Sequence, residues 1–484
     1  MKKLFVLLIA ACMLVTCFAC GGKGNGAPVY NPATKPNAEK WKDLPDNDFG
    51  GQEFRVSTRG GYANLEVIVA NEESEDIIDR ALMLRNARVI DRYNVDILCE
   101  EQSGQAFVHR DYVADSCRLS ADEFDLAMTY VYESSPLITN GFVYNWAKLP
   151  YTKLAESHWI NGMNTQFSVR DAIYTAISKM CISTIGQTVA MVYNRDLGDE
   201  AFGGEEFTNG IFETVRAGDW TYDYFMGIVN QYDWEDSGND GRTADDSYAL
   251  YMTLDWSIDT WHAAWEIPMI RNTEKNGLED VYMQNDKVLT YADRMHTMYH
   301  NTNNIFGGTQ SQATDAFKGR RALFTTIALS GTINHLADME DTYTILPQPK
   351  FDENQANYRS AMFDNYSVMS IPITADPNFV SLIVEALSIS SEDNVYPVYR
   401  VEALQGLYLS DTDSYEMLDI VLNSVSWDIA TLLNENFPMM TIVRFDVQNN
   451  PKNPQVTQAY NGMKKKIQDE LKNIMFAFDQ FQDN

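Results

Sequence analysis

Four of the places where this sequence sets aromatic side chains beside carboxylates, amides or arginine carry its candidate ligand-binding residues. Two of these places lie in the first third of the chain, one lies near residue 260 and one near residue 365. Flat aromatic rings stack on the weakly polar C–H faces of a sugar ring, while carboxylates, amides and arginine bind its hydroxyl groups. We therefore take the following side chains as candidate ligand-binding residues: Arg59 and Tyr62; Tyr130, Tyr132 and Glu133; Trp256, Asp259, Trp261 and Trp265; Asp364, Asn365 and Tyr366.

A structural interpretation competes with the binding one at several of these residues. Trp256, Trp261 and Trp265 recur at intervals of five and four, which is equally typical of the buried face of a helix. Tyr130 lies inside an apolar run and fits a strand core, and Glu133 is placed to cap a following helix. Both interpretations stay open at this stage.

Several candidates follow segments that have the pattern of strands. Residues 52–58 alternate polar and apolar side chains, and residues 75–92 have helical spacing with Ser74 as the expected N-cap. Residues 95–99 and 124–131 are again strand-like. A strand, helix, strand order predicts a parallel α/β sheet, in which ligands bind beyond the carboxyl ends of the strands.

The composition indicates a large chain with a sizeable core and an acidic surface. Of 484 residues, 45% are hydrophobic, and 68 acidic residues against 37 basic ones give a formal charge of −31. Such a surface repels phosphate backbones, so we expect no nucleic-acid partner. Beyond residue 20 the cysteines are Cys99, Cys117 and Cys181, whose spacing gives no zinc or redox motif.

Motifs of enzymes are absent from the sequence. His296 and His300 are four residues apart, but Thr297 follows His296, so the pair is not the HExxH arrangement of a zinc protease. A nucleophile elbow, a phosphate-binding loop and a dinucleotide-binding glycine pattern are also missing. These motifs therefore give no support for an enzyme, we expect no cofactor, and we expect both histidines at the surface.

An acidic stretch at residues 236–246 resembles a calcium-binding loop. Asp236, Asp240 and Gly241 fit its first, fifth and sixth positions, whereas Gly238 and Ser247 do not suit its third and twelfth. We predict a solvated acidic loop there and no metal site.

The start of the chain has the pattern of an export signal that ends at a cysteine. The apolar run at residues 4–19 is too short for a comfortable membrane span of roughly 20 residues, and the small Ala19 suits cleavage before Cys20. This pattern resembles a bacterial lipoprotein signal. It predicts lipidation of Cys20, with Cys12 and Cys17 as alternatives, and attachment at the extracytoplasmic face of the cell membrane.

Five segments, taken in their order along the chain, resemble the sugar-binding solute-binding proteins of bacterial ABC importers. Residues 79–95 resemble the first helix of such proteins and its entry into the second strand. Residues 317–324 are similar to the strand that returns through the hinge, and residues 343–354 to the next strand and loop. Residues 396–404 and 414–420 resemble a carboxyl-terminal stretch of one lipoprotein subgroup.

This resemblance spans nearly the whole mature chain and implies an α/β two-lobe periplasmic-binding-protein fold of class II. Parallel-rich sheets flanked by helices would then hold a ligand in a cleft between two lobes that close by hinge bending. It further implies a protein without catalytic residues that captures a sugar or oligosaccharide and delivers it to an ABC permease. The same resemblance implies that residues 130–133 and 255–261 fall where sugar-contacting residues lie.

The expected organisation has four parts. A signal peptide at residues 1–20 is followed by a proline-containing flexible linker at residues 21–48. The N-terminal lobe is expected to comprise residues 49–182 plus 330–376, and the C-terminal lobe residues 183–329 plus 377–484.

Two other functions stay open. One is an anchored surface glycan-acting enzyme such as a glycoside hydrolase, which two carboxylates about 5–9 Å apart in the cleft would favour. The other is a non-transport polysaccharide-binding surface protein, for which we expect a broad exposed groove in place of a closing cleft.

Overall fold

The computed structural model describes residues 37–62, 66, 68–71, 73–74, 76–104, 106–233, 235–238, 240–273, 277–405, 411–433 and 439–483. The predicted signal peptide, Cys20 and most of the predicted linker lie outside these residues. Within the described part of the chain no helix is both long enough and apolar enough to cross a membrane.

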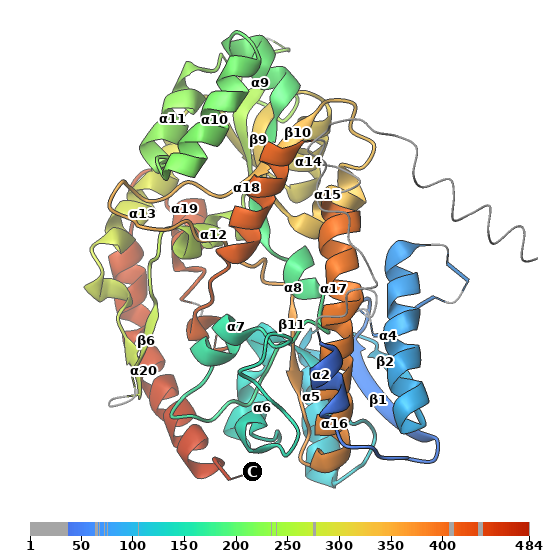
Figure 1. The fold of residues 1–484 in the computed structure, drawn as a ribbon. Helices are drawn as coiled ribbons and strands as arrows, with labels where there is room; N and C mark the ends of the chain where they lie inside the picture. The colour runs from blue at the N-terminus through green and yellow to red at the C-terminus, as the bar shows by residue number, and fades with distance from the viewer. Residues whose placement is uncertain are drawn as a thin grey trace, which may run out of the picture. The chain divides into compact units, whose positions relative to one another are not determined.

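The first lobe is built on a four-stranded sheet with the order β11-β3-β1-β2 (Figure 1). β1 is parallel to β2 and to β3, and β11 is antiparallel to β3. Three helices, α4, α5 and α16, pack beside this sheet. The bounds are β1 (Gln52–Arg59), α4 (Ile77–Tyr93), β2 (Val95–Gln102), α5 (Ala106–Leu119), β3 (Leu126–Tyr130), β11 (Ser367–Ser370) and α16 (Pro377–Asp393).

The predicted strand, helix, strand unit at the start of this lobe is confirmed. The N-cap of α4 is Asp76, whose side chain accepts a hydrogen bond from Ile78 N, and not Ser74 as predicted. The Ser74 hydroxyl, two residues before this cap, instead accepts a hydrogen bond from the backbone N–H of Asp76. α4 ends at Asn94, which has a left-handed backbone with φ of 51° that stops the helix and starts β2.

The second lobe is built on a five-stranded sheet with the order β10-β4-β9-β5-β8. β5 is parallel to β8 and β9, whereas β4 is antiparallel to both β9 and β10. The strands are β4 (Val189–Asn194), β5 (Tyr248–Thr253), β8 (Ile305–Gly308), β9 (Ala322–Ala328) and β10 (Tyr343–Leu346). A separate two-stranded hairpin consists of β6 (Ile270–Thr273) and β7 (Gly277–Asp280). The two-lobe α/β fold predicted from the sequence is confirmed.

The remaining helical elements cover the two sheets and connect them. They are α2 (Ala38–Lys42), η1 (Val131–Glu133), α6 (Ser135–Thr139), η2 (Trp146–Lys148), α7 (Asn161–Gln166), α8 (Ser183–Gly186), α9 (Arg195–Phe202), α10 (Glu205–Ala217), α11 (Tyr222–Gln231), α12 (Trp256–Ala264), η3 (Tyr282–Gln284), α13 (Lys287–His296), η4 (Thr297–Asn301), α14 (Gln310–Lys318), α15 (Leu329–His335), α17 (Val395–Pro397), η5 (Val398–Gln405), α18 (Thr412–Asn423), η6 (Ile429–Thr431), α19 (Ile442–Asn449) and α20 (Val456–Gln480).

Two chain segments run between the lobes and pair with each other. The segment after α8 pairs with the segment before β11, because Val189 N donates to Ala361 O at 2.8 Å and Phe363 N donates to Gln187 O at 2.7 Å. These hydrogen bonds are antiparallel and also pair Thr188 with Met362. Figure 1 shows α8 between the two sheets.

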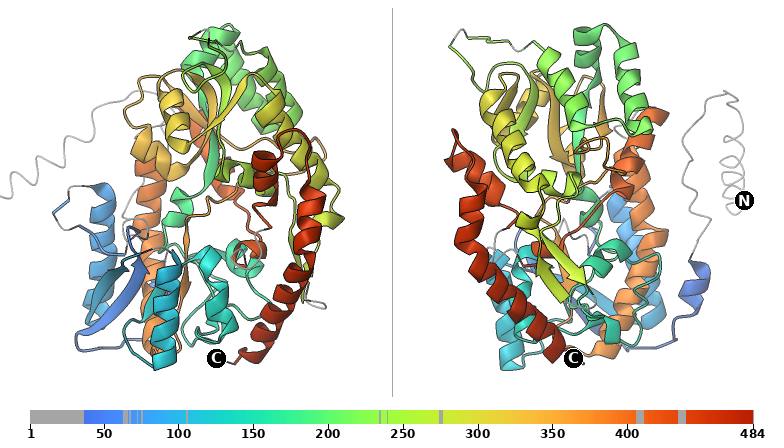
Figure 2. Two further views of the ribbon diagram at one scale, coloured as in Figure 1. Left: turned by 180° about the vertical axis from the view of Figure 1, so that it is seen from behind. Right: turned by 90° about the vertical axis from the view of Figure 1, so that its left-hand side faces the viewer.

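The long carboxyl-terminal helix α20 is a further connection between the lobes. It packs against α6 of the first lobe and against α13, α19 and the hairpin strand β7. Both views of Figure 2 show it running along the outside of the two lobes. Near its end, the ring of Phe478 meets that of Tyr174 edge-on at 4.8 Å, and Asp479 forms an ion pair with Arg170.

The lobe boundaries predicted from the sequence differ from the observed sheets at two places. β10 lies within residues 330–376, which were assigned to the N-terminal lobe, yet it pairs with β4 of the second sheet. α16 was assigned to the C-terminal lobe, yet its Phe379 contacts Phe54 of β1 and Phe49, with ring centroids 6.1 and 4.8 Å apart. In both cases long-range packing decides the position, and local sequence periodicity carries no information about it.

The predicted linker is also shorter than expected at its carboxyl end. Within residues 21–48, α2 packs against α16 of the first lobe. Asn37 donates to Glu392 at 2.6 Å, and the Arg88 guanidinium lies over the ring of Trp41 at 4.0 Å. These polar and cation–π contacts hold residues that a composition-based prediction treats as solvated.

We predict that the buried face of α20 contributes strongly to stability. Ile474→Ala removes a side chain that is 1% exposed, so we expect the free energy of unfolding to fall by about 2–5 kcal/mol. Phe476→Ala on the same helix removes a side chain that is 67% exposed, so it should change the free energy of unfolding by less than about 0.5 kcal/mol. Urea unfolding measures both. Equal effects would show that α20 does not pack as described.

Candidate functional site

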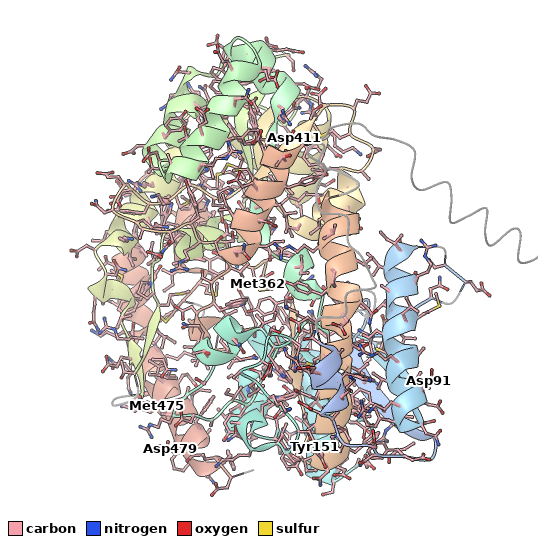
Figure 3. The ribbon with its side chains drawn as sticks, in the orientation of Figure 1. Asp91, Tyr151, Met362, Asp411, Met475 and Asp479 are labelled. Carbon is pink, nitrogen blue, oxygen red and sulfur yellow. The ribbon has the colours of Figure 1, made fainter. Side chains whose placement is uncertain are left out.

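A cavity of about 540 Å³ is lined by residues of both lobes and of the segments that run between them. Five of the predicted ligand-binding residues line it: Tyr132, Trp256, Asp259, Asp364 and Tyr366. Met362, on the segment before β11, lines the cavity and is labelled near the centre of Figure 3.

α12 supplies one wall of this cavity. Asp255 caps the helix by accepting a hydrogen bond from Trp256 N at 2.7 Å. Trp256, Asp259, Thr260 and Ala263 all line the cavity, and their spacing of three, four and seven residues places them on one face of the helix.

The opposite face of α12 points into the core of the second lobe. Trp261 is 1% exposed and packs on Trp265, with ring centroids 4.9 Å apart. Trp265 donates its indole N–H to Pro349 O at 3.1 Å. Neither tryptophan lines the cavity, so the core interpretation of this pair fits the structure.

The first lobe contributes two tyrosines from neighbouring strands. Tyr132 lies in η1, directly after β3, and Tyr366 directly precedes β11, which pairs with β3 in antiparallel fashion. A backbone hydrogen bond of 3.3 Å from Val131 N to Tyr366 O joins these two strand ends. The carboxyl end of β3 therefore forms part of the cavity wall, as the α/β pattern predicts.

The segment between the lobes brings an aromatic ring and a carboxylate to the cavity. Phe363 packs against Trp256, with ring centroids 4.8 Å apart and planes tilted by 58°. Asp364 follows it, and burial raises the pKa of the Asp364 carboxyl to about 6, against the effect of the Arg444 and Arg59 guanidinium groups.

Asp259 is the second perturbed carboxylate of the cavity. Burial raises the pKa of Asp259 well above its usual range, while the Arg444 guanidinium, 3.3 Å away, acts in the opposite direction. The charge of Asp364 adds to the upward shift of the Asp259 pKa. Two carboxyls that have raised pKa values and influence each other at one cavity are a marker of a functional site.

Three other candidates form a cluster at the same sheet edge without lining the cavity. Arg59 is 2% exposed, donates to the Asn365 side chain at 3.2 Å, and lies over the rings of Tyr62 and Tyr130 at 3.9 and 4.7 Å. This cluster supports the segment that carries Asp364. Glu133 is engaged elsewhere, in an ion pair with Arg110 at 2.5 Å.

Several residues that line the cavity were missed by the sequence-based prediction. The backbone of Ser360 pairs with that of Ser424 and Ser426, and this pairing brings Trp427 to the cavity, where its indole donates to Met362 Sδ at 3.0 Å. No local motif marks these positions. The lining residues not predicted include Gln166, Thr260, Glu266, Met269, Arg359, Met362, Phe363, Trp427, Asp428 and Met440.

Of the two histidines noted in the sequence, His296 is buried and His300 is half-buried. His296 is 4% exposed and lies 3.4 Å from Asp446, and His300 Nε2 lies 2.9 Å from Val447 O. Asp446 and Val447 both belong to α19. The prediction of a surface position was wrong for His296, because α19 covers a helix face that appears free in the sequence.

In the acidic loop at residues 236–246, carboxylates bind the loop's own backbone. Asp236 accepts hydrogen bonds from Asp240 N and Gly241 N, and Asp246 accepts from Ser237 N and Thr243 N. Among the described residues, no group of three or more potential metal ligands is found.

Comparison with solved structures shows the fold of this chain. The galacto-N-biose/lacto-N-biose I-binding protein of the Bifidobacterium longum ABC transporter matches with a TM-score of 0.56 and 10% identity, over 88% of this chain and 99% of that chain. An ABC transporter solute-binding protein of Thermotoga lettingae bound to α-D-tagatose matches with a TM-score of 0.54 and 12% identity, over 88% and 100%. Mycobacterium tuberculosis UgpB in complex with glycerophosphocholine matches with a TM-score of 0.54 and 10% identity, over 86% and 98%. This chain therefore has the fold of ABC-transporter solute-binding proteins. No protein-family profile matches the sequence, and neither does any curated protein.

We predict that removing the Asp364 charge stabilises the unliganded protein at neutral pH. Because the pKa of Asp364 is about 6 in the folded chain and about 4 in an unfolded one, the folded state loses stability as pH rises between these values. Asp364→Asn should therefore raise the unfolding temperature at pH 7.5 and change it less at pH 5.0. Calorimetry at both pH values, with Asp91→Asn on the exposed face of α4 as the control (Figure 3), measures this. A lower unfolding temperature for Asp364→Asn at pH 7.5 would contradict the prediction.

Proposed function

We propose that this chain is the lipid-anchored, extracytoplasmic substrate-binding component of an ABC import system, and that it captures a carbohydrate in the cavity between its lobes. The observation that carries the proposal is the cavity itself, in which aromatic rings and carboxylates from both lobes converge. Delivery of the ligand to the transmembrane subunits of a permease completes the proposed role.

The composition of the cavity wall suits a sugar. Five aromatic side chains line it, namely Tyr132, Trp256, Phe363, Tyr366 and Trp427. Such rings offer flat surfaces for C–H faces, while Asp259, Thr260 and Asp364 offer groups that bind hydroxyls. A volume of about 540 Å³ lies within the range of small-molecule sites, roughly 300–1,000 Å³.

The fold supports capture by closure. Two lobes joined by paired segments can close around a small ligand by hinge bending, which buries the ligand and presents a closed surface to a permease. The structural neighbours named above include proteins that bind tagatose and lacto-N-biose, and by analogy we propose a sugar or oligosaccharide for this chain. As the neighbours are binding proteins, we propose a binding role without catalysis.

A glycoside hydrolase is the second candidate function, and one specific observation favours it. Asp259 and Asp364 line the same cavity, and the pKa of each carboxyl is raised, chiefly by burial. A pair of carboxyls, one of which holds a proton near neutral pH, is what glycoside hydrolysis requires. The fold favours the binding role over this one.

We predict that a sugar ligand raises the unfolding temperature of purified residues 27–484, because a ligand that binds only the folded state stabilises it. Trp256→Ala should abolish most of this shift, since Trp256 lines the cavity. Trp261→Ala is the matched control on the same helix. It should cost about 3–5 kcal/mol of stability and leave the affinity unchanged, because Trp261 is in the core.

The outcome of a ligand screen separates the candidates. The screen should contain sugars, peptides and polyamines, and each sugar should be recovered by chromatography after incubation. A shift with peptides and none with any sugar would refute the carbohydrate assignment. Recovery of shortened sugars, lost in the Asp364→Asn variant, would favour the hydrolase.

We predict that Cys20 carries the lipid anchor. In a bacterial host that processes lipoproteins, Cys20→Ala should prevent labelling of the full chain by a radioactive fatty acid and should shift it from the detergent phase to the aqueous phase. Cys12→Ala and Cys17→Ala are the controls and should keep both properties. Loss of the label in Cys17→Ala alone would move the anchor to that residue.

A further inference from the structure

The charged residues that line the cavity are mostly acidic. Four carboxylates line it, Asp259, Glu266, Asp364 and Asp428, against one cationic side chain, Arg359. His262 also lines it, and burial lowers the pKa of this histidine to about 3, so it adds no positive charge at neutral pH. Two of the four carboxylates have ion-pair or hydrogen-bond partners within the protein. Glu266 pairs with Arg359 at 2.8 Å. Asp428 accepts hydrogen bonds from the backbone N–H of Met269 and of Ala430, each at 2.8 Å.

The other two carboxylates, Asp259 and Asp364, keep oxygen atoms that can accept hydrogen bonds from a ligand. Asp259 is 7% exposed, and its Oδ1 atom is buried without a hydrogen-bond partner among the described residues. Its other oxygen, Oδ2, lies 3.3 Å from Nε of Arg444. Asp364 forms no ion pair and no hydrogen bond within the part of the chain that the structure describes.

The charges that surround these two carboxylates leave an excess of negative charge. Arg444 and Arg59 favour ionisation of Asp364, whereas the neighbouring carboxylate Asp255 opposes it. Arg59 also faces the buried carboxylate Glu66, which takes up part of its charge. Among the described residues, Arg444 is the cation whose charge acts on both Asp259 and Asp364. The charge of Asp364 also raises the pKa of Tyr130, Tyr132 and Tyr366, and that of Asp259 raises the pKa of Tyr132, Tyr282, Tyr291 and Tyr299, although burial is the main cause for each of these tyrosines.

The aromatic wall next to these carboxylates suits a cation that is attached to a ring. A positive charge is attracted to the face of Trp or Tyr, and the attraction is strongest where water is excluded. Trp256 is 5% exposed, and its indole N–H is buried without an acceptor among the described residues. A ligand that fits this site therefore offers an acceptor oxygen to Trp256 and a donor to Asp259.

We infer that the ligand carries an ammonium group held by Asp259 and Asp364, so that an amino sugar, and not a neutral or acidic sugar, is the preferred class. This inference rests on the proposed sugar-binding function and specifies its substrate. One ammonium group supplies the missing positive charge, and the ring hydroxyls beside it supply the acceptor for the indole. An ammonium group also makes charge-assisted hydrogen bonds, which are roughly twice as strong as neutral ones.

The pH dependence of binding follows from the same groups. An ammonium ligand gains most when Asp364 is ionised, so its affinity should fall as pH drops below about 6, where Asp364 takes up a proton. A single linked proton lowers the affinity by at most about tenfold per pH unit. A neutral sugar should show a much smaller change, because a protonated carboxyl still binds hydroxyls.

Matched sugars test the inference. Glucosamine, galactosamine and mannosamine are each compared with the parent hexose and with the N-acetyl derivative, by calorimetric titration of the mature chain at pH 7.5 and 5.0. We expect at least one amine to bind about tenfold or more tightly than both of its partners at pH 7.5. This preference should shrink at pH 5.0. Spermidine is included as an amine without a sugar ring.

Variants assign the effect to the two carboxylates. Asp259→Asn and Asp364→Asn should each remove the preference for the amine over its parent hexose, because the ammonium group then loses a charged acceptor. Asp91→Asn removes an equal charge from the exposed face of α4 and should leave the preference intact. Calorimetric unfolding of each variant checks that it is folded.

The outcomes distinguish this inference from the proposed function. If a neutral hexose binds as tightly as its amine, the inference is overturned and the sugar-binding function stands. If spermidine binds in a way that depends on Asp259 and no sugar binds, the sugar-binding function falls and the ammonium site stands. If neither an amine nor a sugar binds, both are overturned.

Discussion

The cavity depends on one backbone pairing, that of residues 187–189 with residues 361–363. Buried backbone groups need partners, so the hydrogen bonds from Val189 to Ala361 and from Phe363 to Gln187 fix the register of the two segments. This register packs Val189, Trp256 and Ala361 into one buried cluster and leaves Asp364 at the cavity. A shift of one residue would exchange the side chains that face the cavity for those that face away from it. The position of Asp364 is therefore set by its backbone and does not require an attraction between its charge and the wall.

α12 positions the second carboxylate, Asp259, through the packing of its opposite face. Trp261 and Trp265 are buried in the core of the second lobe, and this packing determines how the helix is rotated. With the rotation fixed, Asp259 lies on the cavity side even though its desolvation is unfavourable. Replacing one buried tryptophan by alanine typically costs about 3–5 kcal/mol. Packing of that size can hold a carboxylate where electrostatics alone would not.

Local sequence patterns predicted the elements well and their long-range partners poorly. The strand, helix, strand unit at the start of the chain and the position of Tyr132 after β3 follow from periodicity and from the geometry of parallel sheets. Trp256 and Trp261 illustrate the limit, because both fit the same helix and only its rotation against β5 decides which one reaches the cavity. Trp427 is brought in by pairing of residues 424–426 with residue 360, which no local pattern encodes. The same holds for β10 and α16, whose partners are more than a hundred residues away along the chain.

The acidic cavity affects both the stability of the protein and its selectivity among cations. With a formal charge of −31 the protein attracts cations of every kind, so simple metal ions compete for the same carboxylates. A small hydrated ion must give up its water to reach Asp259, and the aromatic wall offers it few oxygen ligands in return. A ring-bearing ammonium gains on three counts, because its charge meets the carboxylates, its C–H faces meet Trp256 and Tyr366, and its hydroxyls satisfy the indole N–H. The desolvation that raises the pKa of Asp259 and Asp364 thus lowers the stability of the unliganded protein, and it also disfavours the entry of a hydrated metal ion.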